Sequence, residues 1–232
     1  MSDGKNSDRC VHVEQSAVDG IGARSVPDGG AVEDGSTGRT TLPRDARTAR
    51  TVLVVDRAGP YRKEACRAFF ADRDLDDVNV LVVSLRGSAQ DRIEAFRDHG
   101  LQVPRTLTII SPAGASDGSR TETGGTGGKD VTVENVQDPV DLPKLGMRIT
   151  RTLGEWDDDE ILICFDSLTE LLHSVDLERV YRFVHILSDR LSTENARIHV
   201  HLEGDAFDDR TLAALRPLFD AIFEAPTGVE SP

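Results

Sequence analysis

The chain has 232 residues, of which 41 are acidic and 27 are basic, and its formal net charge is −14. A field of this sign repels nucleic acid and anionic lipid, so binding to DNA, RNA or a membrane surface is disfavoured. Hydrophobic residues make up only 38%, because large apolar side chains are nearly missing from residues 1–49 and 112–130, and the remaining ~160–180 residues can bury a core of their own.

The N-terminal segment differs sharply in composition from the sequence that follows it. Residues 1–49 are rich in Gly, Ser, Thr, Asp and Arg and have no sustained hydrophobic period, so we predict a disordered tail. An ordered domain is predicted over residues 50–225, with a disordered C-terminus at 226–232. It begins with the β-branched strand TVLVV (51–55) and the helix YRKEACRAFFADR (61–73).

Strands and helices alternate through the rest of this domain. The predicted elements are a strand (79–85), a helix (88–100), a strand (105–111), a helix (141–156), a strand (160–166), a helix (176–195), a strand (196–203), a helix (208–219) and a strand (220–225). Such alternation implies parallel βαβ units with helices on both faces of the sheet, so the predicted fold class is α/β. Residues 112–130 are polar and rich in Gly, and we predict a flexible insertion loop there.

The stretch TVLVVDRAGPYRKEA (51–65) has the layout of a phosphate-binding P-loop, with a loop and a lysine between a strand and a helix. A working loop needs glycines that let backbone N–H groups approach the phosphates, and a hydroxyl that holds Mg²⁺. Aligned on Lys63, the chain keeps Gly59 but has Arg62 at the second glycine and Glu64 at the hydroxyl position. These residues are predicted to form a vestigial nucleotide-binding loop, although an accidental strand–turn–helix explains the pattern equally well.

A second nucleotide-site pattern lies about 100 residues further on, where the apolar strand ILICFD ends in Asp166. In a Walker B motif an aspartate at this position holds the Mg²⁺ ion. Many parallel strands also end in an aspartate, so the pattern alone is weak evidence for a metal.

The sequence around Asp166 is more specific. The segment FDSLTELLHSVDLERVYRFVHILSDRL (165–191) resembles the central part of KaiC-like proteins of the RecA ATPase superfamily, and more closely haloarchaeal KaiC-like proteins. The resemblance extends upstream through VENVQDPVDLPKLGMRI (133–149) and downstream through HLEGDAFDDRTLAAL (201–215), so it covers about residues 51–225. It implies a RecA-like, mostly parallel β-sheet flanked by helices.

The same comparison exposes a departure from the family pattern. KaiC-like ATPases carry adjacent acidic residues just after the second strand, where a carboxylate activates the attacking water. Here Arg86 and Gly87 take those positions, and a positive side chain cannot act as a general base, a role typically worth ~10²–10⁴-fold in rate. Together with the altered loop, this implies an abandoned ATPase site.

Other candidate sites are weaker. The segment GGTGGKD (124–130) looks like a phosphate loop, but no buried strand leads into it, which favours a linker. His199 and His201 share one face of a strand and could begin a metal site, but no partner completes it in the sequence, so we interpret them as structural or surface histidines. Cys164 is interpreted as an inert core cysteine, and Ser167 as a helix N-cap.

Cysteine use and hydropathy restrict the cellular setting. An odd count of cysteines without close spacing (Cys10, Cys66 and Cys164) argues against a disulfide framework or a zinc site. No apolar run approaches the ~18 residues of a membrane span, and the N-terminus has no export signal, so a cytoplasmic protein is predicted. Abundant Asp and scarce Lys are typical of proteins that stay soluble at high salt.

The first functional hypothesis is a non-catalytic KaiC-like pseudo-ATPase that acts as a regulatory or scaffold protein, for example in signal transduction. It has no catalytic residues and no cofactor, and its partner is a protein, either a KaiC-like paralogue or a second copy of the chain. The alternative is an ATP-binding sensor or ATPase with a non-standard P-loop. In that case Arg57, Arg62 and Lys63 hold the phosphates, and Asp166 holds Mg²⁺. Binding to nucleic acid or a membrane is not expected.

Overall fold

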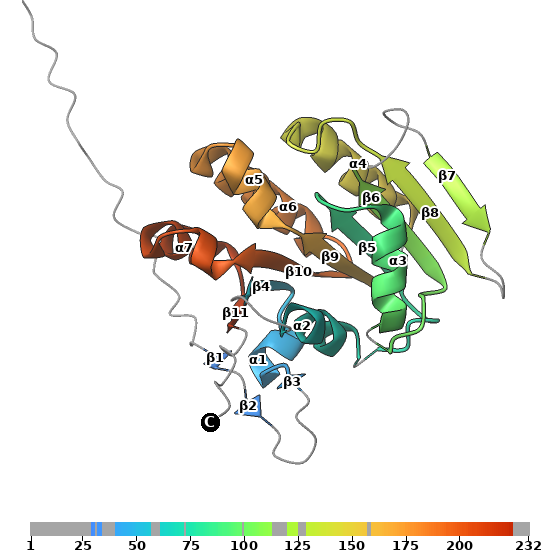
Figure 1. Cartoon of the computed structure of the whole chain (residues 1–232), viewed down its shortest axis with the longest axis horizontal. Coiled ribbons are helices and arrows are strands. Elements are labelled where there is room, and N and C mark those ends of the chain that lie inside the picture. Colours follow the sequence, from blue (N-terminus) through green and yellow to red (C-terminus); the bar gives the residue numbers. More distant parts are fainter. Residues whose placement is uncertain are drawn as a thin grey trace, which may run out of the picture.

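Runs of aliphatic and β-branched residues form the strands of one large sheet, because such side chains fill both faces of a buried strand. The computed structural model describes residues 29–30, 32–33, 40–56, 61–71, 73–98, 100–112, 120–124, 129–156 and 159–224. The strands of the sheet are β1 (Gly29–Gly30), β4 (Thr51–Asp56), β5 (Asn79–Ser84), β6 (Thr106–Ser111), β7 (Arg120–Gly124), β8 (Asp130–Asn135), β9 (Ile161–Asp166), β10 (Ala196–Glu203) and β11 (Ala221–Glu224). Their order is β1-β11-β4-β10-β9-β5-β6-β8-β7 (Figure 1).

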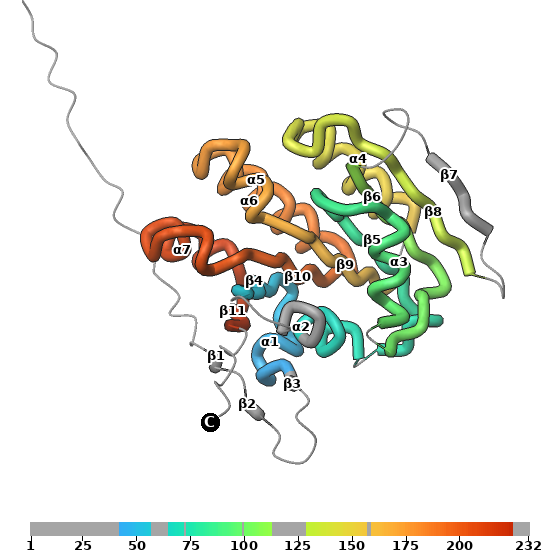
Figure 2. The backbone as a smooth tube through the Cα atoms, in the orientation of Figure 1, coloured from blue at the N-terminus to red at the C-terminus, as the bar shows by residue number. Residues whose placement is uncertain are grey.

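The sheet is mostly parallel, as the sequence predicts. From β11 to β8 each strand is parallel to its neighbours, and β1 is parallel to β11, whereas β7 pairs with β8 in the antiparallel sense. The central strands β4, β5 and β9 are buried along their whole length. Figure 2 shows that β4, from the start of the domain, lies beside β10 and β11 from its end, so the two ends of the domain are joined in one sheet.

Helices cover both faces of this sheet. One face carries α1 (Arg44–Thr48), α2 (Tyr61–Phe70) and α3 (Ala89–Asp98); the other carries α4 (Leu142–Glu155), α5 (Leu168–Ser174), α6 (Leu177–Ser192) and α7 (Asp209–Leu215). Each face of the sheet has its own hydrophobic core, and alternate residues of β4 point into one or the other. Val52 and Val54 pack under α2, whereas Leu53 and Val55 pack under the α4–α7 layer. The predicted α/β architecture is confirmed.

Strand β7 lies where the sequence predicts a loop, and strand β8 was not predicted. β7 lies inside the segment 112–130, and β8 follows it directly. In β8 only Val131 and Glu134 are buried, because the strand lies near the edge of the sheet and needs only a short apolar surface. Its hydrophobic signal is therefore too weak to predict a strand. The flexible-loop prediction is corrected for residues 120–124, while residues 113–119 and 125–128 lie outside the described residues.

Ordered structure also begins earlier than the predicted boundary at residue 50. β2 (Val32–Glu33) and β3 (Thr40–Thr41) form a small antiparallel pair, and α1 follows. Leu42 and Ala46 are buried in the core under α2. Arg197 holds the end of α1, because its guanidinium donates to the carbonyls of Ala46 and Ala49 at 3.2 and 3.0 Å. The disorder predicted for residues 1–49 is therefore corrected for the described residues 29–30, 32–33 and 40–49. Residues 1–28, 31, 34–39 and the predicted disordered C-terminus 226–232 lie outside the described residues.

Helix starts follow the predicted capping residues in part. Asp141 caps α4, with its carboxylate accepting a hydrogen bond from the backbone N–H of Lys144 at 3.2 Å, and Pro143 lies in the first turn. Ser167 stands at the N-cap of α5, as predicted, but its hydroxyl makes no capping hydrogen bond. Among the described residues, no helix has both the length and the apolar character needed to span a membrane.

Candidate functional site

The candidate nucleotide site lies at the carboxyl ends of β4, β5 and β9. Asp56, Ser84 and Asp166 are the last residues of these strands, and Ser84 pairs in register with Asp166. In parallel α/β sheets ligands bind outside the carboxyl ends of the strands. The structure therefore places Asp166 at the carboxyl end of a central strand, and its role as a Walker B aspartate stays a prediction.

The residues of the altered P-loop are only partly visible. Arg62, Lys63 and Glu64 lie in the first turn of α2, directly after β4, so the predicted strand–loop–helix order is present. Because α2 begins at Tyr61, the residue aligned with the second glycine, Arg62, lies in helical backbone. Gly59 lies outside the described residues, so the role of this loop stays a prediction.

Asp166 is paired with an arginine that the sequence did not single out. Nη1 of Arg92, on α3, lies 2.5 Å from Oδ2 of Asp166, whose side chain is 3% exposed. The same guanidinium donates from Nε to the Ser84 hydroxyl at 2.8 Å and from Nη2 to the carbonyl of Arg86 at 3.0 Å. Arg92 is therefore fixed on several sides, and it supplies beside Asp166 the positive charge that Mg²⁺ supplies in a Walker B site.

Arg86 and Gly87, which the sequence resemblance aligns with acidic positions of KaiC-like ATPases, follow β5 directly. Nη2 of Arg86 lies 2.7 Å from Glu203 and Nη1 lies 3.4 Å from Glu170, so Arg86 is tied to β10 and α5. Gly87 has φ +77°, and a Cβ there would lie 3.2 Å from the carboxylate of Asp91. An acidic side chain at position 87 would thus be strained in this turn.

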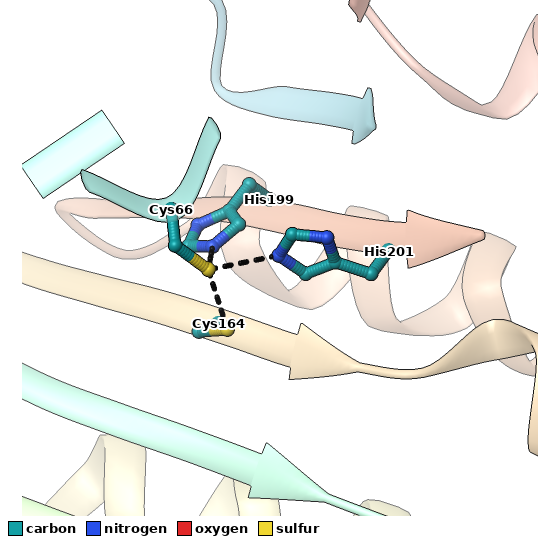
Figure 3. Close-up of side chains that lie close together, drawn as sticks. All are labelled: Cys66, Cys164, His199 and His201. Carbon is teal, nitrogen blue, oxygen red and sulfur yellow. Dashed lines mark hydrogen bonds between the residues drawn. The ribbon is translucent and has the colours of Figure 1, made fainter. Parts of the chain in front are cut away.

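A second candidate site lies under α2, on the face of the sheet that α2 and α3 cover. Cys66 of α2, Cys164 of β9, and His199 and His201 of β10 point toward one another (Figure 3). The Sγ atom of Cys66 lies 3.9 Å from Sγ of Cys164, 3.4 Å from Nε2 of His199 and 3.0 Å from Nε2 of His201. We refer to these residues as the Cys/His cluster.

Strand register explains why these residues meet. His199 pairs directly with Cys164 across β10 and β9, and His201 lies two residues on and so on the same face. Phe69 packs against His199 with ring centroids 4.1 Å apart. On the other side, Nδ1 of His201 donates to Oδ2 of Asp56 at 2.9 Å.

Burial and mutual hydrogen bonds shift the pKa values within the cluster. Burial lowers the pKa of His199. Burial acts in the same direction on His201, but the hydrogen bond to Asp56 and the neighbouring Cys164 outweigh it and raise the pKa of His201 to about 10. The hydrogen bond between the two thiols lowers the pKa of Cys164 and raises the pKa of Cys66. The charges of these four side chains therefore depend on one another.

Sequence reasoning found only part of this cluster. It placed His199 and His201 on one face but found no residue to complete a metal site, and it treated Cys164 as inert. Cys66 and Cys164 are 98 residues apart, and only the strand order, with β9 beside β10 and α2 above both, brings them together. His185 lies on α6 beside Asp189 and takes no part in the cluster.

Comparison with known proteins supports the fold and a family. A model described as a family of unknown function, DUF7504, matches residues 49–225, and no curated protein matches the sequence. The structure of PH0250 from Pyrococcus horikoshii OT3 is similar, with a TM-score of 0.51 and 13% identity over 76% of this chain and 82% of that chain. The flagellar accessory protein FlaH from Methanocaldococcus jannaschii gives a TM-score of 0.42 and 10% identity over 76% and 71%. The chain has a RecA-like fold and belongs to the DUF7504 family.

Proposed function

We propose that this chain is a non-catalytic, KaiC-like RecA-fold protein that acts as a regulatory or scaffold component. The observation that carries the proposal is the ion pair between Arg92 and Asp166, at the position where nucleotide chemistry would need a metal. Arg86 adds a second positive side chain at the position of the catalytic acid, and it is held by Glu203 and Glu170. The Arg92–Asp166 ion pair opposes binding of Mg²⁺, and an arginine in place of the catalytic acid opposes ATP hydrolysis.

Binding of Mg²⁺ at Asp166 would first have to displace Arg92. Displacing Arg92 would break its ion pair with Asp166 and its hydrogen bonds to the Ser84 hydroxyl and the Arg86 carbonyl. The ion pair therefore competes directly with the metal. The alternative of an ATP sensor or ATPase requires this arginine to leave its present position.

A scaffold role needs a surface for a protein partner, and α4 and α6 provide a candidate. Between them lies an apolar groove of about 670 Å³, to which Met147 and Ile186 contribute side chains that are 65% and 60% exposed. Its lining also contains the arginines Arg151, Arg179, Arg182 and Arg190. Arg151, Arg182 and Arg190 are paired with Glu134, Glu178 and Glu194 of the same chain, so the apolar groove has a rim of both charge signs. An interface with an apolar centre and a polar rim suits a second copy of the chain, which is the occupant we propose.

We accordingly propose that copies of the chain associate head to tail, with the α4–α6 groove of one copy on a different surface of the next. Such heterologous contacts build rings or filaments. Sedimentation velocity over a range of protein concentrations tests this directly. Wild-type protein is expected to form species larger than a monomer, and Ile186→Asp to sediment as a monomer.

The matched control for this experiment is Arg210→Glu, an exposed change on α7 outside the groove, which should leave association unchanged. Monomeric wild-type protein at all concentrations would contradict self-association and leave a paralogue as the scaffold partner to be tested by co-sedimentation. Equal association of wild type and Ile186→Asp would place the interface elsewhere and contradict the role of the groove.

A further inference from the structure

We propose that the Cys/His cluster binds a transition-metal ion, with Zn²⁺ as the best match, through Cys66, Cys164, His199 and His201. Two thiolates and two imidazoles form one of the common donor sets of tetrahedral zinc sites. The four donor atoms all lie within 4.8 Å of one another. This inference does not depend on the proposed scaffold role.

The distances agree with a tetrahedral centre. Zn–S bonds of about 2.3 Å and Zn–N bonds of about 2.0–2.1 Å place two sulfurs about 3.8 Å apart, and a sulfur and a nitrogen about 3.6 Å apart. The corresponding separations here are 3.9 Å between the sulfurs, and 3.4 and 3.0 Å from Cys66 Sγ to the two Nε2 atoms. These three separations lie within about 0.6 Å of the tetrahedral values, and all donor atoms lie within 4.8 Å of one another, so we expect modest side-chain movements to be enough for binding.

The surroundings also resemble those of a metal site. Metal-bound histidines usually donate their second ring nitrogen to a carboxylate, which fixes the ring orientation. Asp56 accepts such a hydrogen bond from Nδ1 of His201, so that Nε2 points into the cluster. Both histidines and Cys164 are buried, whereas Cys66 is partly exposed and gives the ion a route in from the α2 side.

Four protein donors leave no coordination position open for a substrate, so the site would be structural. Its ligands connect α2 to β9 and β10. Because α2 directly follows the altered P-loop, the metal would hold in place the helix whose N-terminus carries phosphate in a working RecA-like site. The metal would thus replace a bound nucleotide as the group that anchors this helix to the sheet.

A disulfide is the main alternative for the two cysteines. The sulfurs lie 3.9 Å apart, compared with about 2.05 Å in a disulfide, and both thiols are free in the structure. A disulfide would also leave the convergence of His199 and His201 on Cys66 without a role. The arrangement therefore favours a metal over a disulfide.

Metal analysis of the full chain tests the proposal. Protein purified without added chelator is expected to contain one zinc ion per chain. Apoprotein refilled with Co²⁺ is expected to show the visible absorption of tetrahedral cobalt together with a thiolate-to-cobalt charge-transfer band in the near ultraviolet. Folded protein that binds neither zinc nor cobalt would overturn the proposal, and so would bound cobalt without a thiolate-to-cobalt band. A Cys66–Cys164 disulfide in protein purified under reducing conditions would also overturn it.

Variants separate ligands from merely nearby residues. Asp56→Asn changes a residue that only orients a ligand, and it should lower zinc affinity by ~10–100-fold. Cys66→Ser removes a ligand and should lower zinc affinity by more than that. His185→Ala, which changes an exposed histidine on α6, is the matched control and should bind zinc as wild type does. Wild-type affinity in Cys66→Ser would contradict the assignment.

A variant that lacks a metal ligand can fail to fold, so a second measurement uses only the wild-type chain. Amide hydrogen exchange is compared with and without zinc. Removing zinc should speed amide exchange in α2 and leave exchange in α6, on the opposite face, unchanged. Equal exchange in α2 with and without zinc would contradict the anchoring role.

Discussion

At the scale of single residues, the site is defined by which charges stand beside Asp166. Its carboxylate is buried at the end of β9, and a buried carboxylate needs a compensating cation. In a working nucleotide site a metal would meet this need, whereas here Arg92 does so from α3. Under the proposed function, the ion pair that takes the place of the metal also stabilises the fold.

Arg92→Ala is predicted to destabilise the protein strongly. It removes the arginine that compensates the Asp166 carboxylate, and because Arg92 is itself 23% exposed we expect a loss near the lower end of the buried-pair range, about 3 kcal/mol. The free energy of unfolding in urea measures the effect. The double variant Arg92→Ala/Asp166→Asn should recover much of the loss, and Arg210→Ala, on the surface, should change little. If Arg92→Ala had the same free energy of unfolding as wild type, the Asp166 carboxylate would not depend on this ion pair.

Gly87→Ala is predicted to destabilise the turn after β5 by roughly 1–2 kcal/mol, because an L-residue there must adopt φ +77°. Gly154→Ala is the matched control. Gly154 lies in α4, where a Cβ meets nothing within 4 Å, so this change should stabilise the helix by roughly 0.5–1 kcal/mol. Thermal unfolding of both variants measures the difference, and two shifts of the same sign would contradict the assigned backbone strain.

At the scale of elements, capping and register decide where helices and strands lie. Asp141 is the N-cap of α4 and Asp208 is the N-cap of α7, and each carboxylate accepts a hydrogen bond from a backbone N–H three residues on. The hydrogen bond from Lys144 lowers the pKa of Asp141, and the one from Thr211 lowers the pKa of Asp208. Both caps therefore act in their ionised form.

The capping contribution of Asp141 should depend on pH with a definite sign. Its folded-state pKa is lowered, so its stabilising effect is present above the unfolded pKa of about 3.9 and is lost as pH falls through the folded value. Asp141→Ala should therefore lower the Tm at pH 7, with a difference from wild type that shrinks below pH ~4. Asp141→Asn, which keeps a capping side chain, should lower the Tm less. A difference that grows on acidification would contradict the cap.

At the scale of the whole molecule, the parallel order of the sheet could be predicted, because long apolar runs between helices allow few other arrangements. The elements β8 and α1 could not be predicted, because each buries too few residues to give a hydrophobic period. Asp166 was found because the carboxyl end of a strand is visible in sequence. Arg92 and the Cys/His cluster were missed because their contacts depend on which strands are neighbours and how helices lie over them.

The measurement that tests the central claim most directly is calorimetric titration of the full chain with ATP and Mg²⁺ in molar KCl, followed by a hydrolysis assay. Because Arg92 is paired with Asp166, we predict no detectable binding at millimolar ATP, and because the proposed function has Arg86 in place of the catalytic acid, we predict no turnover. Lys63→Ala and Asp166→Asn should give the same flat titrations as wild type. ATP binding that either variant abolishes would contradict the account and show that the altered loop still serves nucleotide.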